Sequence, residues 1–158
     1  MHENTETVWQ LKKISRYYRD RCVFRDLNVS ILEGEFVVIL GESGSGKSTL
    51  LRMLIGLESP DDGELLFNNI DMNSLSRKQR LQLAQEFGIV FQGGSLFEDL
   101  DVDGNLLFPL DENSAGDRYA ERVDNVLLDC QYQPELKHLF PYQLSGGMKQ
   151  RAALARAL

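Results

Sequence analysis

A nine-residue segment at positions 41–49 constrains this chain more than any other part of it. The segment reads GESGSGKST and fits the pattern G-x-x-x-x-G-K-[S/T]. Glycines let such a loop bend closely around an anion, and the helix that follows directs its N-terminal dipole at the same charge. An apolar run at 36–40 precedes the segment and a helix-forming stretch follows it, as the motif requires. The segment therefore predicts a site for a nucleoside triphosphate.

The residues of this loop have separate expected roles. Lys47 is expected to place its ammonium between the β- and γ-phosphates, and the Ser48 hydroxyl to ligate Mg²⁺. A turn without a binding role explains Gly41, but it does not explain a Lys-Ser pair at the start of a helix. The predicted nucleotide-binding residues of the loop are Gly41, Glu42, Ser43, Gly44, Ser45, Gly46, Lys47, Ser48 and Thr49.

The first part of the chain has the pattern of strands. The alternation of Val29 and Ile31 with polar neighbours predicts a half-buried strand. The unbroken apolar run at 36–40 predicts a parallel strand buried on both faces, and a second short buried strand is expected at 88–91. A hairpin is expected around Asn68-Asn69.

Helices are expected mainly in the second part of the chain. The first expected helix, 47–55, follows the phosphate loop with Leu50, Leu51 and Leu54 on one side. The other helices are expected at 76–85, with Ser76 as N-cap, at 117–130 and at 148–158, and 93–113 is expected to be mostly loop. We expect about 1–92 to form a β-rich part with the phosphate loop, and about 93–158 to form a helical part.

Composition excludes several other classes of protein. Lys and Arg sum to 17 and Asp and Glu to 24, which gives a net charge of −7 and argues against nucleic-acid binding through a broad basic face. The run at 36–40 is far shorter than the roughly 20 residues that span a bilayer. The polar start of the chain lacks the apolar core of a secretory signal. The separated Cys22 and Cys130 are expected to be reduced thiols of a cytosolic protein.

A second anion-binding helix terminus is predicted at 144–148, which reads LSGGM. Ser145 can cap the helix that follows, and Gly146 and Gly147 can expose backbone N–H groups. A chain with both features resembles the ATP-binding-cassette (ABC) ATPases, whose signature LSGGQ differs here only at Met148. The resemblance implies that this segment contacts the γ-phosphate held by the phosphate loop of a second copy, in a head-to-tail dimer with two shared ATP sites.

The same resemblance implies roles for two further residues, Gln92 and Tyr18. Gln92, which follows the apolar segment 88–91, corresponds to the glutamine that reaches Mg²⁺ and the γ-phosphate and signals to the membrane subunit. Ser48 and Gln92 are thus the implied metal ligands. Tyr18 resembles the aromatic residue that stacks on adenine, and Tyr17 is the competing assignment.

The implied fold class is α/β: a P-loop NTPase of the ABC type, with an antiparallel β subdomain, a partial RecA-like core and an α-helical subdomain. Two segments imitate the family's Walker B strand without matching it. The segment 106–112 contains Pro109, which is unsuited to a central strand, and it precedes the signature; the segment 126–129 continues a helical stripe.

We therefore expect the 158-residue chain to be a fragment or an early-terminated product that lacks Walker B and the later strands. Its catalytic residues are unknown, because a catalytic glutamate and a switch histidine are not recognisable. We expect this chain alone not to sustain ATP hydrolysis, and the run at 36–40 to be left uncovered.

The segment 91–100, FQGGSLFEDL, indicates which subfamily of ABC ATPases the chain resembles. It is similar to the ATPase subunits of Mla/Mce-type phospholipid transporters, and Asn105, Pro109 and Leu110 continue the likeness, whereas Lys149-Gln150 departs from it. The resemblance implies an ATP-binding subunit at the cytoplasmic face of the membrane, with a transmembrane permease as partner. The alternatives are an ATPase of an amino-acid or other small-solute importer, and an ABC-fold nucleotide-binding protein without a transport role.

Overall fold

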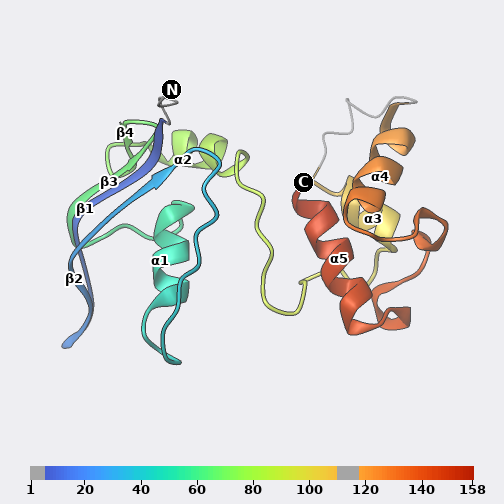
Figure 1. The fold of residues 1–158 in the computed structure, drawn as a ribbon, viewed down its shortest axis with the longest axis horizontal. Helices are drawn as coiled ribbons and strands as arrows, with labels where there is room; N and C mark the ends of the chain where they lie inside the picture. The colour runs from blue at the N-terminus through green and yellow to red at the C-terminus, as the bar shows by residue number, and fades with distance from the viewer. Residues whose placement is uncertain (1–5, 110–117) are drawn as a thin grey trace, which may run out of the picture. The chain divides into compact units, whose positions relative to one another are not determined.

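The structure, a computed structural model, describes residues 6–109 and 118–158 (Figure 1). The chain divides into two compact units, Met1–Glu86 and Phe87–Leu158, which we call the sheet unit and the helical unit. Within the described ranges, no helix combines the length and the apolar character needed to cross a bilayer.

The sheet unit contains a four-stranded antiparallel sheet with the strand order β2-β1-β3-β4. Strands β1 (Thr7–Tyr18) and β2 (Arg21–Leu32) form a long hairpin, while β3 (Asp62–Phe67) pairs with β1 and β4 (Ile70–Asp71) pairs with β3. Half-buried and exposed residues alternate along the second half of β2, so the predicted strand around Val29 and Ile31 is confirmed.

The predicted hairpin turn is also confirmed. Asn68 and Asn69, between β3 and β4, both have positive φ angles, of 47° and 63°. Two consecutive left-handed residues are the requirement of a tight turn whose twist matches that of the strands, and Asn tolerates this conformation better than most residues.

The sheet unit also contains the helices α1 (Lys47–Leu54) and α2 (Arg77–Ala84). Ser76 caps α2 through a reciprocal pair of hydrogen bonds with Gln79, as its position predicted. The side of α1 that carries Leu51 is not its buried side, because Leu51 is 52% exposed. The buried residues of α1 are Thr49 and Met53, one turn apart, and Leu51 lies two positions from each, on the other side of the helix.

The two strands predicted at 36–40 and 88–91 are wrong, whereas the expectation that the run at 36–40 would be left uncovered is confirmed. Segments 36–40 and 88–91 have no strand structure, and Phe36 and Leu40 are 90% and 86% exposed. A central parallel strand becomes buried only when neighbouring strands pair with both edges and other elements cover both faces. Within the part of the chain that the structure describes, no strand pairs with either segment.

In its described residues, 87–109 and 118–158, the helical unit contains three α-helices and two short 3₁₀ turns around one core. The elements are α3 (Val102–Leu107), α4 (Arg118–Asp129), η2 (Pro134–Leu136), η3 (Pro141–Gln143) and α5 (Gly146–Ala157). The buried core consists of Val102, Leu106, Val123, Leu127, Cys130, Tyr132, Leu144, Ala152 and Ala155. These side chains come from all three α-helices and from the segments that join α4 to α5.

The sequence predicted α4 and α5 but not α3. Six residues that include Gly104 are too few to show a helical period, so the segment had the pattern of a loop. Its start is nevertheless well defined, because the Asp101 side chain accepts a hydrogen bond from Gly104 N at 2.7 Å. Helix α5 begins at Gly146 rather than at Met148, and residue 117 of the predicted third helix lies outside the described residues.

Candidate nucleotide-binding site

The predicted phosphate loop leads directly into α1. Gly44 and Gly46 have left-handed φ angles of 77° and 99°, and Lys47 is the first residue of the helix. The Lys47 Nζ donates hydrogen bonds to the carbonyl oxygens of Gly41 and Glu42, both at 2.7 Å. The ammonium is therefore folded back onto the loop. Because Gly46 at the N-cap carries no side chain, the first N–H groups of α1 are left for an anion.

The β1–β2 hairpin holds this loop from one side. A Cβ atom on Gly46 would lie 2.4 Å from Val23 Cγ1 and 2.9 Å from Phe24 Cζ, so glycine is required there for space as well as for its φ. The Arg21 guanidinium donates to the Gly44 carbonyl oxygen at 2.7 Å. The loop's shape thus depends on β2, which the loop motif itself does not include.

We expect Gly46→Ala to lower the melting temperature of the protein clearly more than Gly34→Ala. Both positions have positive φ, so both substitutions introduce backbone strain of about 1 kcal/mol. An added Cβ at Gly34 meets nothing within 4 Å, whereas at Gly46 it collides with two side chains of β2. Thermal unfolding of the two variants measures the difference, and equal melting temperatures would show that the contact with β2 is unimportant.

The predicted signature segment forms the exposed start of α5. The Ser145 Oγ accepts a hydrogen bond from Met148 N at 3.3 Å and caps the helix. Ser145, Gly146 and Gly147 are exposed, whereas Leu144 is buried in the core of the helical unit. The leucine therefore anchors the helix terminus, and the residues that follow present backbone N–H groups to solvent.

The loop after Gln92 is attached to the same helix. Gln92 is exposed and lies outside regular structure. Two residues later, Gly94 approaches α5 so closely that a Cβ there would lie 3.2 Å from the Lys149 carbonyl oxygen. Arg156 of α5 donates to the carbonyl oxygens of Ser95 at 2.9 Å and Gly94 at 3.4 Å. The structure thus joins the loop that carries Gln92 to the signature helix, a connection that the sequence analysis missed.

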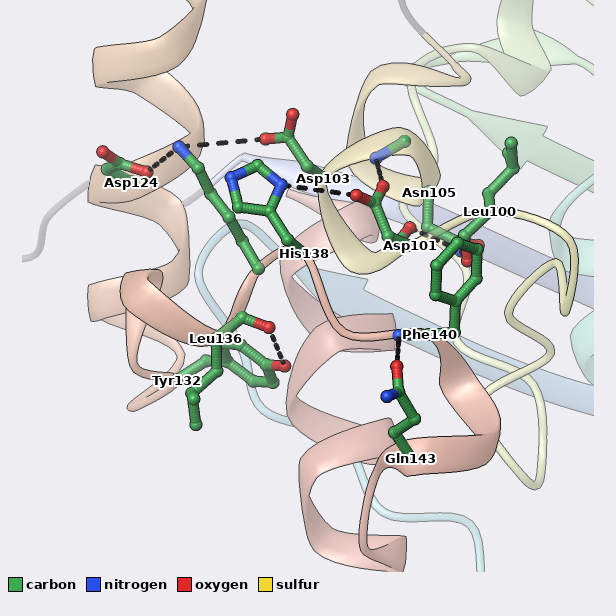
Figure 2. A network of polar contacts seen from close by, with 12 residues as sticks. Leu100, Asp101, Asp103, Asn105, Asp124, Tyr132, Leu136, His138, Phe140 and Gln143 are labelled. Atoms are coloured by element: carbon green, nitrogen blue, oxygen red, sulfur yellow. Dashed lines mark hydrogen bonds and ion pairs between the residues drawn. The ribbon is translucent and has the colours of Figure 1, made fainter.

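Asn105 organises the next part of this loop (Figure 2). The residue is completely buried, and its Oδ1 accepts a hydrogen bond from Phe97 N at 2.7 Å. Its Nδ2 lies 3.0 Å from each of three carbonyl oxygens, those of Phe97, Leu100 and Asp101. One amide side chain thus fixes residues 97–101. In the sequence, a single asparagine between the apolar Val102 and Leu106 is the feature that could have indicated this role.

Ionic contacts tie the start of α3 to the segment before η3. Lys137 Nζ lies 2.7 Å from Asp124 Oδ1 and 3.9 Å from Asp103 Oδ1, and the hydrogen bond with Asp124 is the main cause that raises the pKa of Lys137. Figure 2 also shows His138 directed at Asp101, with 3.4 Å between Nδ1 and Oδ2. These contacts hold in place the helix that carries Asn105.

Loop 97–101 presents an aromatic surface. The rings of Phe97 and Phe108 pack together, with centroids 4.3 Å apart, yet the two residues remain 42% and 61% exposed. The Arg156 guanidinium lies 5.7 Å from the Phe97 ring centroid. Leu100, at the other end of the same loop, is half-buried. Phe97 of this exposed pair lies on the loop that Asn105 binds, and Phe108 lies at the end of α3.

Tyr17 and Tyr18 have different surroundings at the end of β1. The Tyr18 hydroxyl donates a hydrogen bond to Glu58, and this bond is the largest of the influences that keep the pKa of Glu58 below its ordinary value. The Tyr17 side chain instead interacts with Arg25, whose pKa it raises. The predicted site residues therefore fall into two groups: Tyr18 and the phosphate loop in the sheet unit, and Gln92 and the signature segment in the helical unit.

Comparison with known proteins places these features in one family. Residues 24–158 match the family model described as ABC transporter. The chain is 39% identical over 150 residues to the glutamine transport ATP-binding protein GlnQ of Escherichia coli, and 38% identical over 149 residues to the sulfate/thiosulfate import ATP-binding protein CysA of Synechocystis. It is 32% identical over 166 residues to the intermembrane phospholipid transport system ATP-binding protein MlaF of Escherichia coli.

These alignments cover 94%, 94% and 100% of this chain, respectively, but only 62%, 40% and 59% of the relatives. The chain therefore spans about half the length of the curated relatives it matches.

Solved structures agree with this result. The dimeric ATP-binding cassette MJ0796, bound to ADP and Pi in a post-hydrolysis state, matches with a TM-score of 0.82 and 33% identity, over 95% of this chain and 68% of that one. CbiO1 of Clostridium perfringens, part of the transporter complex CbiONQ, matches with a TM-score of 0.85 and 31% identity, over 96% and 61%. The fold is that of a P-loop NTPase of the ABC ATPase type. The chain belongs to the ABC transporter family and represents its ATP-binding domain.

Proposed function

We propose that this protein is the ATP-binding subunit of an ABC transporter and that it binds Mg-ATP at the loop 41–49. The observation that carries the proposal is the geometry of that loop, in which Lys47 folds back onto two carbonyl oxygens at the uncapped start of α1. An anion at this terminus receives backbone N–H groups, and the Lys47 ammonium can exchange its carbonyl partners for phosphate oxygens.

The other predicted residues take complementary roles in this proposal. The exposed Ser48 hydroxyl and the Gln92 amide oxygen are ligands of the kind that Mg²⁺ prefers. Tyr18 stacks on the base. Ser145, Gly146 and Gly147 bind the γ-phosphate held by a second copy, which makes the active form a head-to-tail dimer. Titration calorimetry of the purified protein with Mg-ATP tests the binding step, and ATP-dependent dimerisation is measured by sedimentation.

For the transported molecule we propose a phospholipid, with a transmembrane permease as partner at the cytoplasmic face of the membrane. The support is the segment 91–100, its fixed loop conformation around Asn105 and the similarity to MlaF along the entire chain. The relatives GlnQ and CysA are named for the transport of glutamine and of sulfate or thiosulfate. Because this chain is 39% and 38% identical to them in sequence, a small-solute importer is the alternative. Lipid analysis of the purified complex distinguishes the two, and a protein that co-purifies with no permease would instead favour a role outside transport.

Phe97→Glu and Leu100→Glu are expected to release the ATPase from its permease while leaving Mg-ATP affinity unchanged. We propose that the exposed pair formed by Phe97 and Phe108 contacts the membrane subunit, and a carboxylate there would lose its hydration when the contact forms. Co-purification with the permease is the measurement. Leu128→Glu is the matched control, because Leu128 is 58% exposed on α4 of the same unit. Unchanged co-purification of the Phe97 and Leu100 variants would contradict the proposed contact.

A further inference from the structure

A cluster of charged side chains surrounds Tyr18 at the end of β1. The Tyr18 hydroxyl donates a hydrogen bond of 2.5 Å to Glu58 Oε2, and the Arg16 guanidinium lies over the Tyr18 ring, 4.9 Å from its centroid. Arg16 also donates to Glu58 at 3.2 Å and to Asp61 at 3.0 Å. Groups from two segments, β1 and the connection between α1 and β3, thus hold the ring at its hydroxyl and on one face.

Two members of the cluster, Arg16 and Glu58, are largely shielded from solvent. The side chains of Arg16 and Glu58 are 19% and 21% exposed, and Arg52 Nη1 lies 3.5 Å from the second carboxylate oxygen of Glu58. The carboxylate therefore receives donors at both oxygens. Tyr18 itself is 41% exposed, so part of the ring surface remains open to solvent.

The same ring is connected to the phosphate loop through its partner in the hairpin. Tyr18 pairs with Arg21 across the β1–β2 hairpin, and Arg21 donates to the Gly44 carbonyl oxygen at 2.7 Å. A flat, partly exposed aromatic ring is therefore connected to the predicted phosphate loop through a single intervening residue, Arg21. The Tyr17 side chain instead interacts with Arg25.

We propose that Glu58 and Arg16 are positioning residues, which hold the Tyr18 ring in the orientation that stacks on the base of the bound nucleotide. The inference rests on the proposed function, because it requires a nucleotide at the phosphate loop. Stacking on a ring that is already immobilised loses less conformational entropy than stacking on a free one, so the cluster raises affinity without touching the ligand. Because any flat base stacks, the effect depends on the presence of a base.

The test compares Mg-ATP with Mg-tripolyphosphate, which has the phosphates but no base, by titration calorimetry of the purified protein. We expect Tyr18→Ala to weaken ATP binding by about 10-fold, the loss of one aromatic stacking contact, and to leave tripolyphosphate binding unchanged. Tyr18→Phe keeps the ring, and Glu58→Ala removes its acceptor. Each is expected to weaken ATP binding about 3- to 10-fold, and the double variant no more than either alone.

Glu64→Ala is the matched control. Its carboxylate belongs to the same unit and forms an exposed ion pair with Lys12 at 3.5 Å, so its loss is expected to change neither affinity.

Different failures have different meanings. If Lys47→Ala changes the affinity for neither ligand, the proposed function itself is wrong. If Lys47→Ala weakens both, yet Tyr18→Phe and Glu58→Ala leave ATP binding unchanged, only the positioning role is wrong. A Glu58→Ala variant that weakens ATP and tripolyphosphate equally would assign Glu58 a purely structural role. Because Tyr18→Phe removes a single hydroxyl, it tests the inference even where Glu58→Ala fails to fold.

Discussion

Lys47→Ala is expected to weaken Mg-ATP binding by about 10- to 100-fold. A hydrogen bond from a charged donor contributes roughly 1.5–3 kcal/mol, and each 1.4 kcal/mol corresponds to a factor of ten in affinity. In the structure the ammonium is bound to the carbonyl oxygens of Gly41 and Glu42 at 2.7 Å, so it is already at the loop where the phosphates are expected. Titration calorimetry with Mg-ATP measures the effect.

The control for this substitution is Lys78→Ala, which removes an exposed lysine from α2 in the same unit. Its ATP affinity is expected to match that of the unmodified protein, because a charge in solvent far from a ligand is screened. Lys47→Ala also removes two hydrogen bonds to the loop, so the thermal stability of both variants is compared. Equal ATP affinity of the protein with and without Lys47 would show that 41–49 is not a phosphate loop.

Asn105→Ala is expected to destabilise the helical unit by about 3 kcal/mol or more. Four hydrogen bonds converge on this completely buried side chain, and its removal leaves the backbone groups of the 97–101 loop without those partners. Asn105→Asp is expected to be at least as damaging. Aspartate retains an acceptor for Phe97 N, but it directs a negatively charged oxygen at three carbonyl oxygens. Urea-induced unfolding, followed by circular dichroism, gives the free energies.

Asn125→Ala is the matched control, because Asn125 is exposed on α4. Its effect on the free energy of unfolding is expected to stay within about 0.5 kcal/mol. A loss below about 1 kcal/mol for Asn105→Ala would mean that the loop at 97–101 is held by other contacts, and Asn105 would then not support the proposed permease surface.

Local sequence patterns determined the parts of this protein that depend on neighbouring residues. The capped start of α2 at Ser76, the turn at Asn68-Asn69 and the loop that leads into α1 were all predictable. Each of these follows from hydrogen bonds or backbone conformations within a few residues. The two motifs predicted to bind phosphate were likewise recognisable, because that chemistry requires particular residues at fixed spacing.

Contacts between segments far apart in the chain were decided only by the tertiary structure. The apolar run at 36–40 has the composition of a buried strand, yet its burial depends on pairing partners elsewhere, and Phe36 and Leu40 are exposed in the structure. The roles of Glu58 beside Tyr18 and of Arg156 beside Gly94 likewise depend on residues 40 and 62 positions away. Residue type and spacing along the chain do not indicate which of these distant residues come into contact. The sequence by itself therefore determined which loop is the candidate for phosphate binding, and the folded chain decided which side chains hold that loop and its neighbours in place.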